Sequence, residues 1–392
     1  MNKFALLVFS MAALVVTAGC SKEETTSRDA DLAGVNVAVG EKKSPFSKLF
    51  VLNEGGFQKN NSTLDFFRFS DGNYVSDAFG SMNPAVVQGL GDTGNDIAIH
   101  DGKIWLVMNG SGFVHALDAS DETIIVSIPV PDPRYIAFDD SHAYVSSYAG
   151  AIYGGDAKKG KVYRISLSNY RIDGEVEVGC QPEGIAVVGN EIFVANSGGY
   201  NWVHENTVSV IDRATLKVTS SVEVASNLHF LAADSNGTVW VSSYGESAWT
   251  QDDDGNWIQN MSEPMGLFSF SNKNGYGVTP VNNVHVSCMT ICDDGYLYAI
   301  GNAAEMTGGY DNTLYKVPVA GGAGAVTAVS LPGTDASRVG NPYGICVNPR
   351  NGDIYIADAD YTAPGKVWCF TKDLKLKWSA VAGIIPAHMA LY

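Results

Sequence analysis

The chain has few charged residues and no cluster of basic residues, and it lacks several motifs that are typical of enzymes. Lys and Arg number 25 against 42 Asp and Glu, which gives a net charge of −17. Because contacts to phosphate supply most of the affinity for nucleic acids, this charge argues against DNA and RNA as partners. The sequence also has no Gly-x-Ser-x-Gly nucleophile elbow and no phosphate-binding loop.

Cysteines are scarce and their spacing does not match a zinc site. Apart from Cys20, the chain has only Cys180, Cys288, Cys292, Cys346 and Cys369. No two of them form a Cys-x-x-Cys pair, and most of their neighbours are apolar, so we interpret them as buried small hydrophobes. The acidic run at residues 252–256 lacks the remainder of a calcium loop and is interpreted as a hairpin turn. No metal and no other cofactor is expected.

The most apolar run lies at the N-terminus. "FALLVFSMAALVV" follows Lys3, precedes "TAGC" and is too short to span a bilayer comfortably. This pattern is typical of a secretory signal with a lipoprotein cleavage site. Residues 1–19 are therefore predicted to be the signal peptide and Cys20 the lipidated residue; ordinary signal cleavage, with Cys20 incidental, is the alternative. Residues 20–47 are polar without periodicity, which predicts a flexible stalk.

A four-strand pattern recurs through residues 48–392. "PEGIAVVGNEIFVANSG" from Pro182 and "PYGICVNPRNGDIYIADAD" from Pro342 each predict a strand, a short turn and a second strand. Further copies begin at Asn95, Pro133, Asn227 and Val284, and a third and a fourth strand follow each copy. Four antiparallel strands repeated at roughly fifty residues are typical of β-propeller blades. The predicted fold class is all-β.

One further copy is split between the two ends of this region. "LFVLNEGG" from Leu49 matches a second strand without a first, whereas "PAHMALY" from Pro386 is a strand with no partner after it. We therefore expect the C-terminal strand to complete the N-terminal blade. That pairing makes a seven-bladed propeller and removes the exposed edges of an open array.

Aligning the copies at their turns places polar and aromatic residues at one mouth of the central channel. The predicted ligand-binding residues from the inner strands are Asp96, Arg134, Tyr135, Glu183, His229, Tyr343 and His388. Those from the loops between second and third strands are Phe57, Tyr200, Trp202, Tyr244, Asp360 and Tyr361. Aromatic rings beside polar groups suit a broad, partly apolar ligand. The alternative is that polar residues hydrate the channel while the aromatic residues pack the loops.

The same residues make a weak case for catalysis. Asp96 and Glu183 come from separate blades, and no motif supports them as an acid–base pair. His229 and His388 are too few to hold a metal across a channel. We therefore expect no enzymatic activity, and a lactonase-like hydrolase remains the least favoured alternative.

Over residues 48–392 the repeats resemble YncE-like seven-bladed propellers. The segments "LFVLNEGGFQKNNSTLDFF" and "GDIYIADADYTAPGKVWCF" resemble surface propellers of Bacteroidota, and "SKEE" after Cys20 resembles their surface-export signal. The resemblance implies an outer-membrane lipoprotein that faces the cell exterior and contacts the membrane through its lipid anchor alone. It also implies capture of vitamin B12 or a related corrinoid, which passes to a TonB-dependent transporter. The alternative is a protein-interaction or adhesion propeller without a small-molecule ligand.

Overall fold

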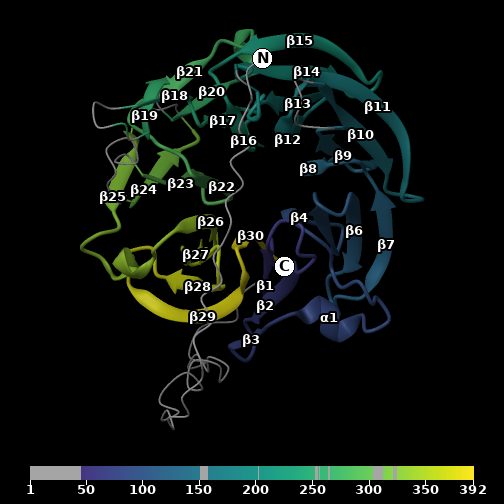
Figure 1. The fold of residues 1–392 in the computed structure, drawn as a ribbon, viewed down its shortest axis with the longest axis vertical. Coiled ribbons are helices and arrows are strands. Elements are labelled where there is room, and N and C mark those ends of the chain that lie inside the picture. The colour runs from purple at the N-terminus through teal and green to yellow at the C-terminus, as the bar shows by residue number, and fades with distance from the viewer. Residues whose placement is uncertain are drawn as a thin grey trace, which may run out of the picture. The chain divides into compact units, whose positions relative to one another are not determined.

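The structure is a computed structural model that describes most of the chain after residue 45. The described residues are 46–150, 158–201, 203–251, 255, 257–263, 265–302, 312–320 and 325–392, and all belong to the compact unit of residues 34–392. Within them, seven four-stranded antiparallel sheets are arranged in a ring (Figure 1). The predicted all-β, seven-bladed propeller is therefore confirmed. The predictions for the signal peptide, Cys20 and most of the stalk lie outside the described residues.

The blades follow one another along the chain, and the innermost strand comes first in blades 2 to 7. Blade 1 contains β1 (Lys48–Asn53), β2 (Thr63–Arg68), β3 (Asn73–Val75) and β30 (Pro386–Leu391). Blade 2 contains β4 (Gly94–His100), β5 (Lys103–Met108), β6 (Phe113–Asp118) and β7 (Ile124–Pro129). Blade 3 contains β8 (Pro133–Phe138), β9 (His142–Ser147), β10 (Lys159–Ser166) and β11 (Arg171–Cys180). Blade 4 contains β12 (Pro182–Val188), β13 (Glu191–Asn196), β14 (Thr207–Asp212) and β15 (Lys217–Glu223).

Blade 5 differs from its neighbours by an inserted hairpin. Its sheet contains β16 (Leu228–Ala233), β17 (Val239–Ser243), β20 (Gly266–Phe270) and β21 (Thr279–Val281), and the hairpin is β18 (Glu246–Gln251) with β19 (Trp257–Glu263). Blade 6 contains β22 (Cys288–Cys292), β23 (Tyr296–Asn302), β24 (Asn312–Pro318) and β25 (Thr327–Ser330). Blade 7 contains β26 (Pro342–Val347), β27 (Ile354–Asp358), β28 (Pro364–Phe370) and β29 (Leu376–Ile384). Short helices are α1 (Ala78–Met82), η1 (Asn272–Asn274) and η4 (Asp335–Arg338). None of the helices in the described part of the chain is long and apolar enough to cross a membrane.

The C-terminal strand closes blade 1, as predicted. Strand β30 pairs antiparallel with β1, so that Leu391 lies opposite Leu49 and Met389 opposite Val51. All of β1 is buried, and Leu49 to Leu52 are fully inaccessible to solvent. The Lys48 amide also donates to the Tyr392 carbonyl at 3.0 Å. The two distant segments of the chain therefore form one continuous sheet.

Every blade places a large aromatic residue of one strand opposite a smaller residue of its inner neighbour. The pairs are Phe50–Ala390, Trp105–Ala98, Tyr144–Ala137, Phe193–Ala186, Trp240–Ala232, Tyr298–Thr290 and Tyr355–Cys346. Directly opposed residues point to the same face of a sheet, so the small partner leaves room for the ring. All seven aromatic side chains are buried, and so are the five cysteines predicted to be small hydrophobes.

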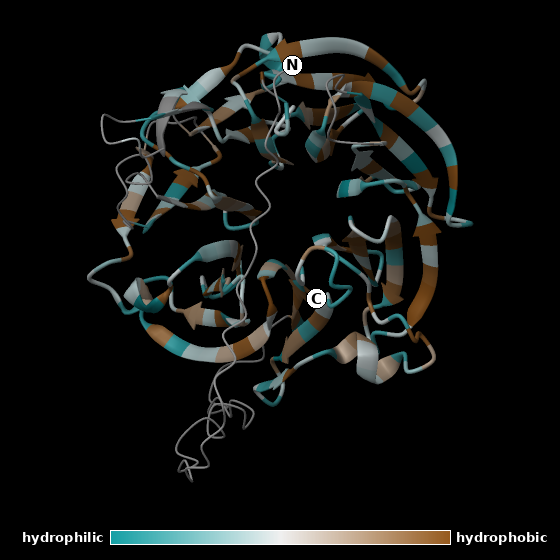
Figure 2. Ribbon diagram, in the orientation of Figure 1, coloured by the Kyte–Doolittle hydropathy of each residue, from teal (hydrophilic) through white to brown (hydrophobic). Residues whose placement is uncertain are grey.

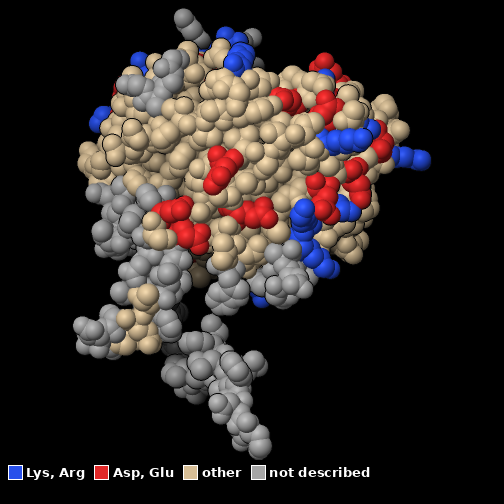
Figure 3. Space-filling view, turned by 90° about the horizontal axis from the view of Figure 1, so that it is seen from above, with Lys and Arg blue, Asp and Glu red and all other residues tan. Residues whose placement is uncertain are grey.

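The outer strands carry alternating apolar and polar residues, as a strand with one buried face should (Figure 2). In blade 3, three ion pairs join the outer strands β10 and β11: Lys159–Glu177, Lys161–Glu175 and Arg164–Asp173. Figure 3 shows acidic and basic side chains interspersed on one face of the molecule. The exposed pairs contribute little to stability. Each basic residue in them lies beside an acidic one, which agrees with the absence of a basic cluster in the sequence.

Candidate functional site

A cavity of about 830 Å³, here called the mouth, opens at one end of the central channel. Inner-strand residues from several blades and loops between second and third strands line it. Seven of its lining residues are aromatic: Phe57, Tyr135, Tyr148, Tyr200, Phe230, Tyr244 and Tyr343. A deeper cavity of about 410 Å³ continues along the inner strands. The two cavities share Tyr135, Phe230, Tyr343 and His388, which we call the collar.

Most of the predicted ligand-binding residues line these cavities. Eight of the thirteen line the mouth: Phe57, Arg134, Tyr135, Tyr200, His229, Tyr244, Tyr343 and His388. Asp96 lies below the collar, where it lines the deeper cavity. Trp202 is outside the described residues. The structure therefore brings together residues that are more than three hundred positions apart in the sequence, such as Phe57 and His388, because the propeller gathers the start of each inner strand at one face.

Three of the predicted residues occupy other positions. Glu183 is buried beside the mouth without lining it, and its carboxylate is bound by neighbouring side chains. Asp360 is solvent-exposed, and its carboxylate accepts hydrogen bonds from the Thr362 and Ala363 amides of its own turn. Tyr361 is also exposed and stands edge-on to Tyr343, with the ring centroids 5.9 Å apart. These three therefore do not line the mouth, and their role in ligand binding stays a prediction.

A buried ionic network joins blades 3 and 4 at the wall of the mouth. The Arg134 Nε donates to Glu183 Oε2 at 2.9 Å, and the Tyr148 hydroxyl donates to the other oxygen, Oε1. The Arg134 guanidinium also lies over the Tyr148 ring, 4.8 Å from its centroid. Because both carboxylate oxygens have a partner, the burial of this charge is compensated within the protein.

The network continues into blade 5 through His229. Its Nε2 shares a hydrogen bond of 3.1 Å with the Tyr135 hydroxyl, and its ring stacks on Tyr244 with the centroids 4.6 Å apart. Burial lowers the pKa of His229 to about 4, although nearby Glu183 favours the charged form. His229 is therefore neutral at physiological pH, where it acts as a rigid polar plane rather than as a cation.

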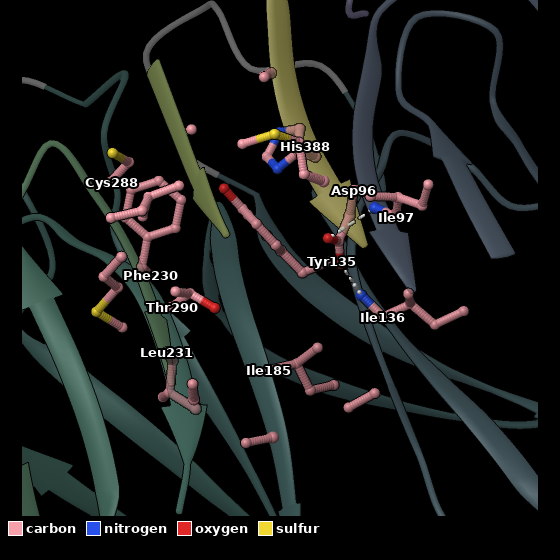
Figure 4. A pocket seen from close by; sticks show the side chains of 18 of the residues that line it. Asp96, Ile97, Tyr135, Ile136, Ile185, Phe230, Leu231, Cys288, Thr290 and His388 are labelled. Carbon is pink, nitrogen blue, oxygen red and sulfur yellow. Dashed lines mark hydrogen bonds between the residues drawn. The ribbon is translucent and has the colours of Figure 1, made fainter. Parts of the chain in front are cut away.

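Below the collar, Asp96 is a half-buried carboxylate without a cationic hydrogen-bond partner among the described residues. Its oxygens accept hydrogen bonds from the Ile97 amide at 2.9 Å and the Ile136 amide at 3.0 Å (Figure 4). Burial raises the pKa of Asp96 to about 6, and nearby His388 opposes that shift. Asp96 thus joins blades 2 and 3 and changes its charge close to neutral pH.

Two glycines of the inner strands, Gly184 and Gly344, serve the packing of blades. A Cβ at Gly184 would lie 2.3 Å from the Leu231 amide of blade 5, and one at Gly344 would lie 1.6 Å from the Ala387 carbonyl oxygen of β30. Neither distance leaves room for a side chain. At these points adjacent inner strands touch, so the backbone itself narrows the channel.

Comparisons with known proteins place the chain in a family. The model of DUF5074, a domain of unknown function, matches residues 48–363. The chain belongs to the DUF5074 family. No curated protein sequence matches it significantly.

Several solved structures share the fold of this DUF5074 propeller at low sequence identity. Hydrazine synthase of Kuenenia stuttgartiensis is 15% identical with a TM-score of 0.56, covering 75% of this chain and 88% of that chain. A putative 6-phosphogluconolactonase of Bacteroides fragilis is 13% identical with a TM-score of 0.53, covering 90% and 100%. AztD of Citrobacter koseri is 12% identical with a TM-score of 0.51, covering 88% and 97%. At such identities the likeness shows the propeller fold alone.

Sequence reasoning missed two aromatic residues of the DUF5074 mouth. Tyr148 holds the buried Glu183, and Phe230 is part of the collar. A signal for Tyr148 was present, since "VSSY" ends the second strand of blade 3 as it does that of blade 5, where Tyr244 was recognised. Phe230 directly follows His229 on β16. It lacks a comparable signal, because the residues at the equivalent position in the other blades are not aromatic.

The described lining of the mouth offers aromatic faces and polar groups for contact and hydrogen bonding. Across the part of the chain that the structure describes, no three His, Cys, Asp or Glu side chains are grouped so that they could hold a metal ion. The two predicted acid–base candidates are kept apart by their own partners: Glu183 is bound by Arg134 and Tyr148, and Asp96 lies below the collar. Aromatic faces and fixed polar groups remain to meet a ligand.

Proposed function

We propose that this propeller captures vitamin B12 or a related corrinoid at its mouth and passes it on chemically unchanged. The observation that carries the proposal is a mouth of about 830 Å³ lined by seven aromatic residues. This volume lies within the usual range of ligand pockets. Flat aromatic faces suit a large, partly apolar ring, and the neighbouring amides and hydroxyls suit the amide side chains of a corrinoid.

The shape of the mouth also fits transfer to a second protein. A corrinoid is too large to be enclosed fully by this cavity, so part of the ligand would stay outside. That part offers a surface to an acceptor before the propeller releases the ligand. We propose that the acceptor is a TonB-dependent transporter of the outer membrane, in keeping with the resemblance of the strands at both ends of the propeller.

Isothermal titration of the propeller with cyanocobalamin tests this function. Phe57 and Tyr200 line the mouth yet are 67% and 54% exposed, so their replacement should leave the fold intact. We expect one-to-one binding that Phe57→Ala and Tyr200→Ala each weaken roughly tenfold or more, since aromatic residues dominate such interfaces. Tyr361→Ala is the matched control, because Tyr361 is equally exposed but lies outside the cavity. No binding to the unaltered protein, or equal weakening by all three variants, would overturn the proposal.

The proposed location is the outer face of the outer membrane, with Cys20 as the lipid anchor. Cys20→Ser should abolish lipid labelling and release the protein from the membrane fraction. In intact cells, added protease should remove the wild-type propeller. Protection of the wild-type protein from external protease would contradict an outward-facing location while leaving ligand binding untouched.

A further inference from the structure

Arg134 is the only Lys or Arg among the described residues that line the mouth. It is the second residue of β8, and its side chain is 15% exposed. Glu183 holds it through Nε at 2.9 Å, and the Tyr148 ring covers its face. Because Tyr148 in turn donates to Glu183, the three side chains fix one another in a single arrangement.

This arrangement leaves one edge of the guanidinium available. Within the described part of the chain, the bond to Glu183 is the only hydrogen bond that the Arg134 side chain makes. Since Nε is occupied and Arg134 lines the mouth, its two terminal nitrogens are the donors left for a ligand. A planar guanidinium with a free pair of N–H groups matches the two oxygens of a carboxylate or phosphate. Holding it in place beforehand lowers the entropy cost of that contact.

The charges elsewhere in the mouth restrict where an anion can bind. Asp92 lines the mouth, and its oxygens accept from the Gln58 and Asn60 amides. Glu54 and Asp132 also line it and repel an anion. His229 is neutral and supplies no compensating charge. An anionic group is therefore favoured at the Arg134 edge and disfavoured beside the acidic lining residues, which orients an otherwise neutral ligand.

We propose that Arg134 forms a subsite for an anionic group of the ligand, a phosphate or a carboxylate. This inference rests on the proposed function: in a cobalamin the group is the phosphodiester that links the corrin ring to its nucleotide. The propeller would then read both parts of the ligand, the ring by its aromatic residues and the nucleotide arm by Arg134. A corrinoid without the nucleotide arm would lose the second contact.

The test compares cyanocobalamin with cobinamide, which has the same ring and lacks the phosphodiester. Removing Arg134 alone would leave the buried Glu183 unpaired, at a cost of several kcal/mol, so the comparison uses the wild-type protein and the double variant Arg134→Gln/Glu183→Gln. We expect the wild-type protein to prefer cyanocobalamin over cobinamide by about tenfold or more, and the double variant to bind both alike. Arg171→Gln, on the exposed outer strand β11, is the control for loss of an arginine outside the mouth.

The outcomes separate this inference from the proposed function. Tight binding of both corrinoids with no preference, or a preference that survives in the double variant, overturns the subsite and leaves corrinoid capture standing. If neither corrinoid binds, the function fails, and inorganic phosphate then probes the subsite directly. At matched ionic strength, phosphate should raise the melting temperature of the wild-type protein and of Arg171→Gln above that measured in chloride, but not that of the double variant. Equal shifts in all three proteins would overturn the subsite as well.

Discussion

The closure of the ring can be tested by a single added methyl group at Gly344. This residue of β26 faces the closing strand β30, and a Cβ there would lie 1.6 Å from the Ala387 carbonyl oxygen. Contacts of real Cβ atoms essentially never fall below 3.0 Å. Gly344→Ala therefore forces the backbone of β30 away from β26, at the interface where the last blade meets the first.

The size of the effect follows from what has to move. Overpacking a core typically costs about 1–3 kcal/mol, and backbone relieves a clash less easily than a flexible side chain, so we expect about 3 kcal/mol. Alanine also restricts the unfolded chain, which returns about 0.4–1 kcal/mol. The net destabilisation should thus be about 2–3 kcal/mol, a large share of the roughly 5–15 kcal/mol that stabilises a typical protein.

Gly277→Ala is the matched control for this measurement. Its added Cβ would find its nearest neighbours at 3.6 Å, an ordinary contact, and the residue is exposed. Urea unfolding followed by circular dichroism should give a clearly lower midpoint for Gly344→Ala and a midpoint near wild type for Gly277→Ala. Equal midpoints for the two variants would refute the close contact between β26 and β30.

Three further expectations concern closure and the buried titratable groups. Deleting residues 386–392 uncovers β1, so we expect loss of the cooperative thermal transition and its recovery when the missing segment is added as a peptide. Folding lowers the pKa of His229 from 6.5 to about 4, so the folded state binds fewer protons than the unfolded state between these two pH values. Stability is therefore lost as the pH drops through that window, by about 3 kcal/mol. His229→Gln should accordingly reduce the difference between the urea midpoints measured at pH 7 and at pH 4.5. The pKa of Asp96 rises from 3.8 to about 6, so its ionisation lowers stability as the pH rises through that window; Asp96→Asn should increase the midpoint at pH 7 relative to that at pH 4.5. Unchanged pH profiles would contradict the burial of these two groups.

The architecture was predictable because it depends on local patterns that repeat. Strand alternation and turn residues mark each hairpin, and the incomplete copies at Leu49 and Pro386 could satisfy their edges only by pairing with each other. The largest difference in a strand start is in blade 6. Its first strand was expected from Val284 but begins at Cys288, and Val284 and Val286 are buried in one core cluster with Leu297 and Ala299 of β23.

The site was predictable only as a set of positions around the ring. Alignment of the repeats gives the blade to which each residue belongs, but it does not give the depth along the channel or the partner across a blade boundary. Asp96 and Tyr135 occupy equivalent positions in the alignment, yet Asp96 lines only the deeper cavity while Tyr135 belongs to the collar. The Arg134–Glu183 contact joins residues 49 positions apart, and no short-range pattern encodes such a pair.

These contacts between blades determine how the mouth can bind. Arg134, Glu183 and His229 come from three successive blades, and their contacts hold that side of the mouth rigid before any ligand arrives. Little ordering is then required of the inner wall, so affinity depends mainly on desolvation and fit. The exposed Phe57 and Tyr200 stand on loops rather than on the inner strands. A rigid inner wall with outer contacts on loops would let the proposed acceptor loosen the ligand by displacing the loops alone, without opening the propeller.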